Sequence, residues 1–158
     1  MKKLEFDIIS IFPGVFGPLF DESILGRARD RGILDIRVHN LRDYTLDKHK
    51  KVDDYPFGGG VGMVLGVEPI VRAIEAVKRD RPRAHAILMS PSGSQFDQDK
   101  AWELSRMDSL IIICGRYEGV DERVGLYFVD EEISIGDYVV SGGEVPAMVV
   151  VEAVARLL

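Results

Sequence analysis

Strand-like and helix-like segments alternate along almost the whole chain, and this alternation constrains the fold more than any other feature of the sequence. Apolar or alternating runs typical of strands occupy residues 4–11, 33–38, 84–89, 109–114 and 127–135. Helical patterns lie between them, over 13–31, from 68, after 97, over 121–126 and from 144 to the end. This order predicts one α/β domain in which a mostly parallel sheet carries helices on both faces.

One stretch, residues 40–66, has no clear period. It is polar at first and then rich in glycine, with Gly58, Gly59, Gly60, Gly62 and Gly66 close together. A segment this long without regular structure inside a compact domain is usually functional or mobile.

Three further glycine-bearing segments, 90–94, 115–119 and 135–144, each follow a predicted strand. The carboxyl ends of parallel strands form the crevice in which α/β proteins bind ligands. Each segment taken alone is also explained as a tight turn that needs glycine. The three together predict one pocket for a small molecule, formed largely by backbone groups.

Charge and cysteine content exclude several classes of protein. The chain has 26 acidic and 20 basic side chains, so bulk electrostatics does not favour binding to nucleic acid. The first third is locally basic, which fits either a solvated surface or a phosphate-contacting one. The single cysteine, Cys114, rules out an internal disulfide and paired-cysteine zinc sites, and it fits a reducing compartment such as the cytoplasm. No uncharged apolar run reaches 18 residues, so we expect no transmembrane helix and no membrane partner.

Common nucleotide-binding and hydrolase motifs are absent from the sequence. It contains no GxxxxGK[ST], no GxGxxG after the first predicted strand, no HExxH and no GxSxG. A nucleotide- or NAD-binding oxidoreductase is therefore disfavoured, although the alternating pattern alone allows it. A non-enzymatic dimerisation or RNA-binding module is the other alternative, and it predicts no response to a cofactor.

Two long segments carry a specific resemblance. Residues 114–123 read CGRYEGVDER, and residues 132–148 read EISIGDYVVSGGEVPAM. With SIFP at 10–13, GGGVGM at 58–63 and LMSP at 88–91, they resemble the bacterial tRNA (guanine-N1)-methyltransferases of the SPOUT class. The resemblance spans essentially the whole chain. Phe57 and Val61 depart from the commonest family residues but leave the glycine framework intact.

The resemblance implies a fold that general rules would make improbable. The family's sheet carries a deep trefoil knot near its C-terminal end, through which the three loops are threaded. It also implies an obligate homodimer. The predicted helix that begins at Glu144 is apolar nearly all round, which suits burial by the core and by a partner subunit.

The resemblance further implies that S-adenosylmethionine binds inside the knot. The implied cofactor-binding residues are Leu88, Ser90, Pro91, Gly93, Gly115, Tyr117, Gly119, Ile135, Gly136, Tyr138, Val140, Gly142, Gly143 and Pro146. Glu118 matches a carboxylate near the methyl donor, and Arg156 matches an arginine that helps to orient the guanine. Asp53, Gly59 and Met63 belong to the segment that meets the target guanosine.

The implied reaction is methyl transfer to N1 of guanosine 37 of tRNA, just 3′ of the anticodon. In the family, Mg²⁺ can assist. The general base is an aspartate that follows the position of Arg156, and a helical C-terminal domain grips the anticodon stem-loop. Neither is found up to Leu158, so we expect residues 1–158 to be the cofactor-binding domain, inactive on tRNA by itself.

Overall fold

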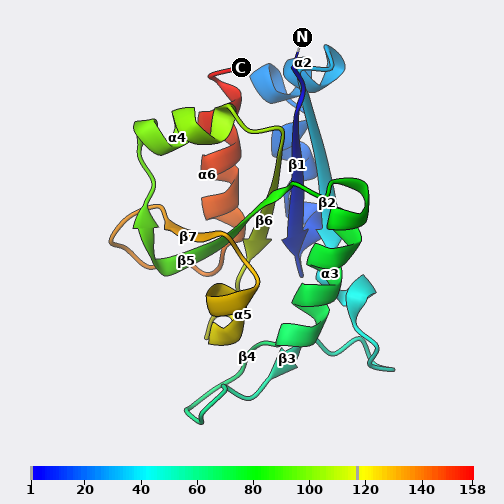
Figure 1. The fold of residues 1–158 in the computed structure, drawn as a ribbon, viewed down its shortest axis with the longest axis vertical. Coiled ribbons are helices and arrows are strands. Elements are labelled where there is room, and N and C mark those ends of the chain that lie inside the picture. The colour runs from blue at the N-terminus through cyan, green and yellow to red at the C-terminus, as the bar shows by residue number, and fades with distance from the viewer. Residues whose placement is uncertain (1, 117) are drawn as a thin grey trace.

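Five parallel strands form the central sheet in the order β2-β1-β6-β5-β7 (Figure 1). Residues 2–116 and 118–158 are described in this computed structural model. The strands are β1 (Leu4–Ser10), β2 (Leu34–Asn40), β5 (His85–Gln95), β6 (Ser109–Cys114) and β7 (Glu131–Ser134). Because all neighbouring pairs are parallel, the strands end at one common edge. The predicted α/β class and parallel sheet are confirmed.

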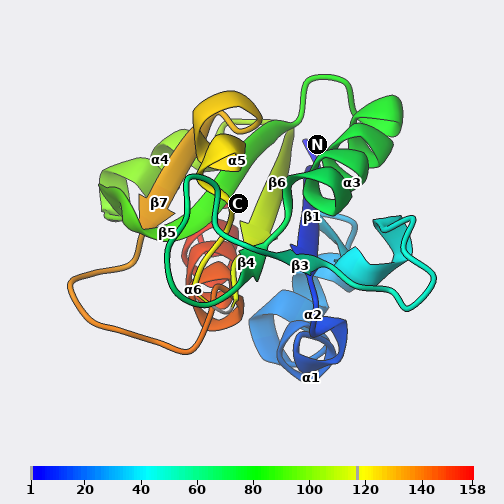
Figure 2. The same cartoon turned by 90° about the horizontal axis from the view of Figure 1, so that it is seen from below.

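Helices cover both faces of this sheet. On one face lie α3 (Val67–Asp80) and α5 (Glu122–Tyr127). On the other lie α1 (Gly17–Phe20), α2 (Ser23–Asp30), α4 (Gln98–Ser105) and α6 (Glu144–Ala155). Figure 2, which looks toward the carboxyl edge, separates α3 and α5 from α6, α2 and α1. No helix within the described residues is both long and apolar enough to cross a bilayer.

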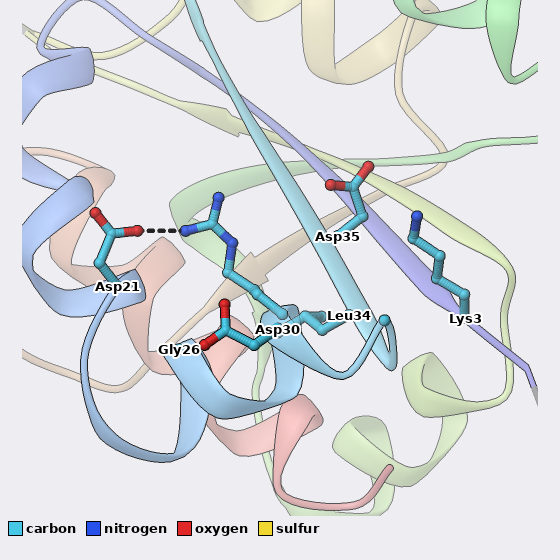
Figure 3. A pocket seen from close by; sticks show the side chains of 8 residues that line it. Lys3, Asp21, Gly26, Asp30, Leu34 and Asp35 are labelled. Carbon is cyan, nitrogen blue, oxygen red and sulfur yellow. Dashed lines mark hydrogen bonds and ion pairs between the residues drawn. The ribbon is translucent and has the colours of Figure 1, made fainter.

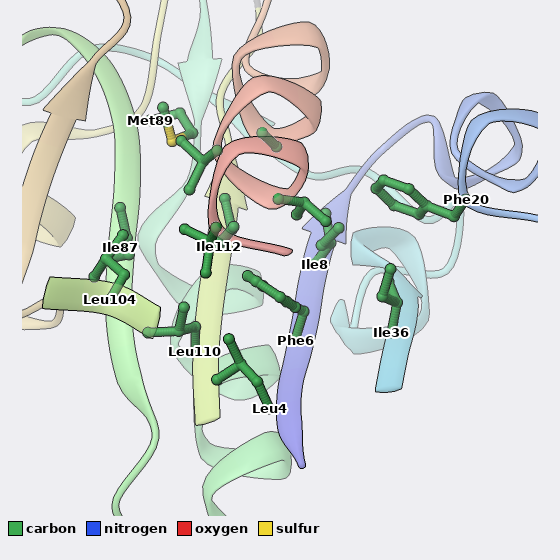
Figure 4. Packing of buried hydrophobic residues seen from close by; sticks show 14 of the residues in the cluster. Leu4, Phe6, Ile8, Phe20, Ile36, Ile87, Met89, Leu104, Leu110 and Ile112 are labelled. Carbon is green, nitrogen blue, oxygen red and sulfur yellow. The ribbon is translucent and has the colours of Figure 1, made fainter. Parts of the chain in front are cut away.

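The strand β6 lies at the centre of the sheet and is buried on both sides. Leu110 and Ile112 point into the core beneath α4 and α6, while Ile111 and Ile113 point into the core beneath α3. Figure 4 shows Leu110 and Ile112 packed beside Phe6 of β1 and Leu104 of α4. A strand buried on both faces is apolar at most positions, which explains the run from Leu110 to Ile113 in its sequence.

The predicted helix over 13–31 is divided in the structure. A 3-10 turn at Pro13–Val15, α1 and α2 replace it, and the chain bends at Asp21 and Glu22. A Cβ at Gly26 would lie 2.4 Å from the carbonyl oxygen of Asp21, so this glycine lets α2 pack back against the bend. The predicted stop at Gly32 is confirmed, with a φ of 71°.

The stretch 40–66 contains short elements that its sequence pattern did not indicate. These are a 3-10 turn (Leu41–Tyr44) and the antiparallel pair β3 (Asp53–Asp54) and β4 (Val64–Leu65). The strand β5 is longer than predicted because it bulges. Both Met89 and Ser94 lie opposite Ile133 of β7, so the residues between them leave the ladder.

A buried carboxylate, Asp7 in the middle of β1, binds three basic side chains. It accepts hydrogen bonds from Nε of Arg37 at 2.9 Å and from Nη1 of Arg81 at 2.5 Å, and its Oδ1 lies 2.7 Å from Nε2 of His39. Burial alone would raise the pKa of Asp7. The hydrogen bonds of His39 and Arg37 and the charges of Arg81 and Arg37 outweigh burial and lower the pKa below its ordinary value of 3.8.

Replacement of this carboxylate, Asp7→Asn, should lower the free energy of unfolding by about 3 kcal/mol near pH 7, because it removes the buried anion shared by Arg37, Arg81 and His39, although Arg81 keeps its ion pairs with Glu5 and Asp35. A lowered pKa in the folded state makes the stabilisation present above about pH 4 and lost as the pH falls below it. Urea unfolding at several pH values should therefore show the wild type and the variant converging in acid. The exposed Asp99→Asn is the control; a pH-independent difference for Asp7→Asn would contradict the ionic account.

Candidate functional site

A cavity of about 570 Å³ opens at the carboxyl edge of the sheet, where β5, β6 and β7 end. Its wall is formed by the first loop (residues 88–92), the described residues of the second loop (115–116 and 118–120), the third loop (132–136 and 138–143), part of α5, and the beginning of α6 at Pro146. Three loops that are distant in sequence therefore meet around one space, as the position of the glycine segments predicts.

The first loop is the bulge of β5, and Gly93 makes the bulge possible. A Cβ at Gly93 would lie 2.5 Å from the backbone nitrogen of Ile133. This glycine thus lets β5 return to the ladder against β7, and it lies outside the cavity wall. Its place in the structure is that of a residue that shapes the loop.

The second and third loops touch through their backbones. The N–H of Gly143 donates a hydrogen bond of 2.9 Å to the carbonyl oxygen of Gly115. A Cβ at Gly143 would lie 2.8 Å from the Cα of Cys114 and from the backbone nitrogen of Gly115. Only glycine permits this approach, because any side chain would push the two loops apart.

The glycine-rich segment between β3 and β4 is fastened to the second loop. The N–H of Glu118 donates to the carbonyl oxygen of Met63, and the N–H of Leu65 donates to the carbonyl oxygen of Gly119, both at 3.0 Å. The Glu118 side chain lies against Gly62, where a Cβ would be 2.5 Å from its Cγ. The segment is therefore part of the surroundings of the cavity.

A second attachment joins the same segment to the start of α5. The guanidinium of Arg123 lies over the ring of Phe57, 4.3 Å from its centre. Asp121 accepts hydrogen bonds of 3.0 and 2.8 Å from Nε and Nη2 of Arg123. These hydrogen bonds lower the pKa of Asp121, so the carboxylate stays ionised and holds the guanidinium in place.

Most of the cofactor residues expected from the sequence line this one cavity. They are Leu88, Ser90, Pro91, Gly115, Gly119, Ile135, Gly136, Tyr138, Val140, Gly142, Gly143 and Pro146, together with Glu118. Tyr117 lies outside the described residues. Arg116, Glu122 and Glu132 also line the cavity but were not among the expected residues. All three stand inside the two motifs, Arg116 and Glu122 in residues 114–123 and Glu132 at the start of residues 132–148, and this was the available signal.

The residues expected to meet the guanosine occupy different places. Asp53 pairs with Leu65 across β3 and β4, Gly59 lies in the segment between those strands, and Met63 contacts the second loop. Arg156 caps the C-terminal end of α6, whereas Pro146 of the cavity lies in its first turn. A 12-residue helix is about 18 Å long, so a single chain keeps Arg156 away from its own cavity.

The cavity wall contains more negative than positive side chains. The negative side chains in the wall are those of Glu118, Glu122 and Glu132. The positive one among the lining residues is the guanidinium of Arg116. The remainder of the wall is backbone and small or apolar side chains. This combination suits a ligand with an apolar ring system and a positive charge.

No metal-binding cluster accompanies the cavity in the described part of the chain: no three His, Cys, Asp or Glu side chains lie close enough to hold an ion. The described residues do not fit a Mg²⁺ site made by this chain alone.

Another hollow, of about 490 Å³, lies at the opposite edge, where β1 and β2 begin (Figure 3). Lys3, Asp21, Asp30 and Asp35 surround it, and Asp21 forms an ion pair of 2.6 Å with Arg29. It is lined mostly by polar groups and offers little apolar surface, so it does not suit a nucleoside.

A parallel α/β sheet whose glycine loops enclose a cavity at the carboxyl edge defines the class of this protein as a small-molecule-binding α/β domain. The family is given by comparison with known sequences. Residues 4–158 match the profile of the tRNA (guanine-1)-methyltransferase TrmD family. The chain belongs to this family.

Individual relatives agree with that assignment. The chain is 54% identical over 155 residues to a tRNA (guanine-N(1)-)-methyltransferase of Geobacter sulfurreducens, covering 98% of this chain and 63% of the relative. It is 56% identical over 155 residues to the protein of the same description from Dictyoglomus turgidum, covering 98% and 62%. The chain thus spans about six tenths of the length of these curated relatives.

A solved structure has the same fold. The crystal structure of tRNA (m1G37) methyltransferase from Aquifex aeolicus superposes with a TM-score of 0.90 at 39% sequence identity. The match covers 99% of this chain and 71% of that one. The arrangement of the sheet and helices is therefore that of the family.

Proposed function

We propose that residues 1–158 form the S-adenosylmethionine-binding domain of a tRNA (guanine-N1)-methyltransferase that acts on guanosine 37. The observation that carries the proposal is the convergence of the family's motif residues on one cavity with glycine-built walls. S-adenosylmethionine fits the wall, because it combines an adenine ring with a positively charged sulfonium. The same activity and the single cysteine favour the cytoplasm as its compartment.

The cavity residues have three roles in this proposal. Backbone groups and small side chains of the third loop, from Ile135 to Gly143, hold the adenosyl group. The carboxylate of Glu118 faces the positively charged methionine end. Met63 accepts a hydrogen bond from the backbone of Glu118, and Gly62 lies against the Glu118 side chain. These contacts hold the segment from Asp53 to Met63 beside the cavity, where guanosine would lie.

Methylation at N1 of guanine needs alignment and a proton acceptor. The cofactor supplies a methyl group bound to a sulfonium sulfur, a good leaving group. The loops align this methyl with the guanine and exclude water, which converts an encounter in solution into a reaction between fixed partners. N1 carries a proton, so a general base must take it. The resemblance places that base on an aspartate after the position of Arg156, in the part of the relatives that this chain does not span.

We also propose that the three loops form the trefoil knot of the family. The hydrogen bond from Gly143 to Gly115 and the backbone contact of Gly143 with Cys114 support it, since they hold the third loop against the second. A threaded loop cannot open simply by swinging outward, which would keep the cavity shaped before the cofactor arrives.

A homodimer completes the proposal. The helix α6 buries Ala147, Val150 and Val151 in its own core, yet Val145 and Val149 remain exposed on another side. Arg156 lies at the end of α6 away from its own cavity, so it would orient guanine in the cavity of the partner subunit.

Light scattering at micromolar concentration should give twice the mass of the 17.6-kDa chain, and the mass of a single chain would contradict the assembly.

S-adenosylmethionine should stabilise the chain. At a hundred times its dissociation constant it adds about 2.7 kcal/mol, which raises the melting temperature by about 5–10 °C for a domain of this size. Gly143→Ala should abolish the rise, because its Cβ meets the backbone of Cys114 and Gly115 at 2.8 Å. Gly14→Ala is the control, since a Cβ there meets nothing within 4 Å. An equal rise with NAD would favour the oxidoreductase alternative.

Transfer of labelled methyl to unmodified tRNA tests the reaction itself. The assay uses a protein that contains this chain and has the full length of the relatives. A transcript with guanosine at position 37 should be labelled at N1, and a transcript with adenosine there should not. Equal labelling of both transcripts, or labelling at another atom, would overturn the assignment.

A further inference from the structure

A buried carboxylate lies behind the cavity wall without lining the cavity itself. Glu144 is the first residue of α6 and only 2% of it is exposed. Its Oε2 accepts a hydrogen bond of 2.7 Å from the Ser10 hydroxyl, and its Oε1 accepts one of 2.7 Å from Nε of Arg116. Buried carboxylates are costly unless they are paired, so the fold depends on both partners.

The partner Arg116 is held by groups from three different segments. Besides Glu144, its guanidinium lies over the ring of Phe12, 4.6 Å from the centre, and its Nη1 lies 3.4 Å from the carbonyl oxygen of Ser141. Arginine suits this place because its planar group can stack and form ion pairs at the same time. Arg116 lines the cavity, so these contacts fix one part of the wall.

The third loop takes its path around this ion pair. A Cβ at Gly142 would lie 2.5 Å from Nε of Arg116 and 2.9 Å from Oε1 of Glu144. The space beside Gly142 is thus filled by the two charged groups. The ion pair sets how closely the third loop approaches the second loop from which Arg116 projects.

We propose that Glu144 is a positioning residue for the cofactor site and acts through Arg116. It holds the guanidinium between Phe12 and Ser141, and thereby fixes the separation of the second and third loops. Without the negative charge, Arg116 would be attracted toward Glu118, Glu122 or Glu132, which line the same cavity. This role deepens the proposed function and rests on it.

The test is calorimetric titration with S-adenosylhomocysteine, the unreactive product of the cofactor. Glu144→Gln keeps the size of the side chain and removes its charge, and it should weaken binding at least tenfold. Arg116→Lys should weaken binding similarly. If Glu144 acts through Arg116, the double variant should bind no more weakly than the weaker single variant. A purely structural role of Glu144 predicts independent losses that multiply.

The matched control is Glu152→Gln, the same change at an exposed position of α6, which should leave affinity within twofold. Urea unfolding of each unliganded variant shows whether it is folded during the titration. If Glu144→Gln does not fold, Phe12→Leu and Ser10→Ala decide the question, because they leave both charges in place. Each should weaken binding about threefold or more.

Two negative results have different meanings. If the wild type fails to bind S-adenosylhomocysteine, the proposed function falls and this role falls with it. If the wild type binds and folded Glu144→Gln binds equally well, only the positioning role is overturned. If Glu144→Gln does not fold, the same conclusion follows when Phe12→Leu and Ser10→Ala both bind as well as the wild type. Multiplicative losses in the double variant would also overturn it.

Discussion

The approach of Gly143 to the backbone of Cys114 and Gly115 is the contact on which the cavity depends. It joins the end of the central strand β6 to the beginning of α6, with no side chain between them. The direction in which α6 leaves the third loop follows from this contact. The burial of Glu144 follows as well. Glu144 comes directly after Gly143, so its side chain enters the space between Ser10 of β1 and Arg116 of the second loop.

The sequence predicted those elements whose local pattern and tertiary environment agree. The run before Cys114 became the central strand because burial on both faces favours apolar residues at most positions. The helix expected after residue 97 is α4, and Asp97 caps it by accepting a hydrogen bond from the N–H of Lys100. The division of residues 13–31 was not predictable from periodicity. It depends on the contact of Gly26 with Asp21, which appears only when the chain turns back on itself.

The three loops of the candidate site were predicted from the sequence, whereas the contacts between distant residues in it were not. Glycine segments after strands indicated the three loops, since strand order in a parallel sheet brings their ends together. Gly93, expected among the cofactor-binding residues, lies in the bulge of β5 and not in the cavity wall, and a glycine pattern does not distinguish approach to a ligand from approach to backbone. Glu144 stands inside the motif of residues 132–148, but local sequence does not indicate which side chains it pairs with. Its partners Ser10 and Arg116 are 134 and 28 residues away along the chain.

The link between Ser10 and Glu144 also has a consequence for how the protein is made. A ribosome releases β1 first and α6 last among these elements, so the first strand waits for its final partner while more than a hundred residues are added. Contacts this distant in sequence form late and slow the folding of a domain. Until they form, the apolar surface of β1 is exposed to other nascent chains and to chaperones. The cavity is therefore among the last parts of residues 1–158 to become native during synthesis.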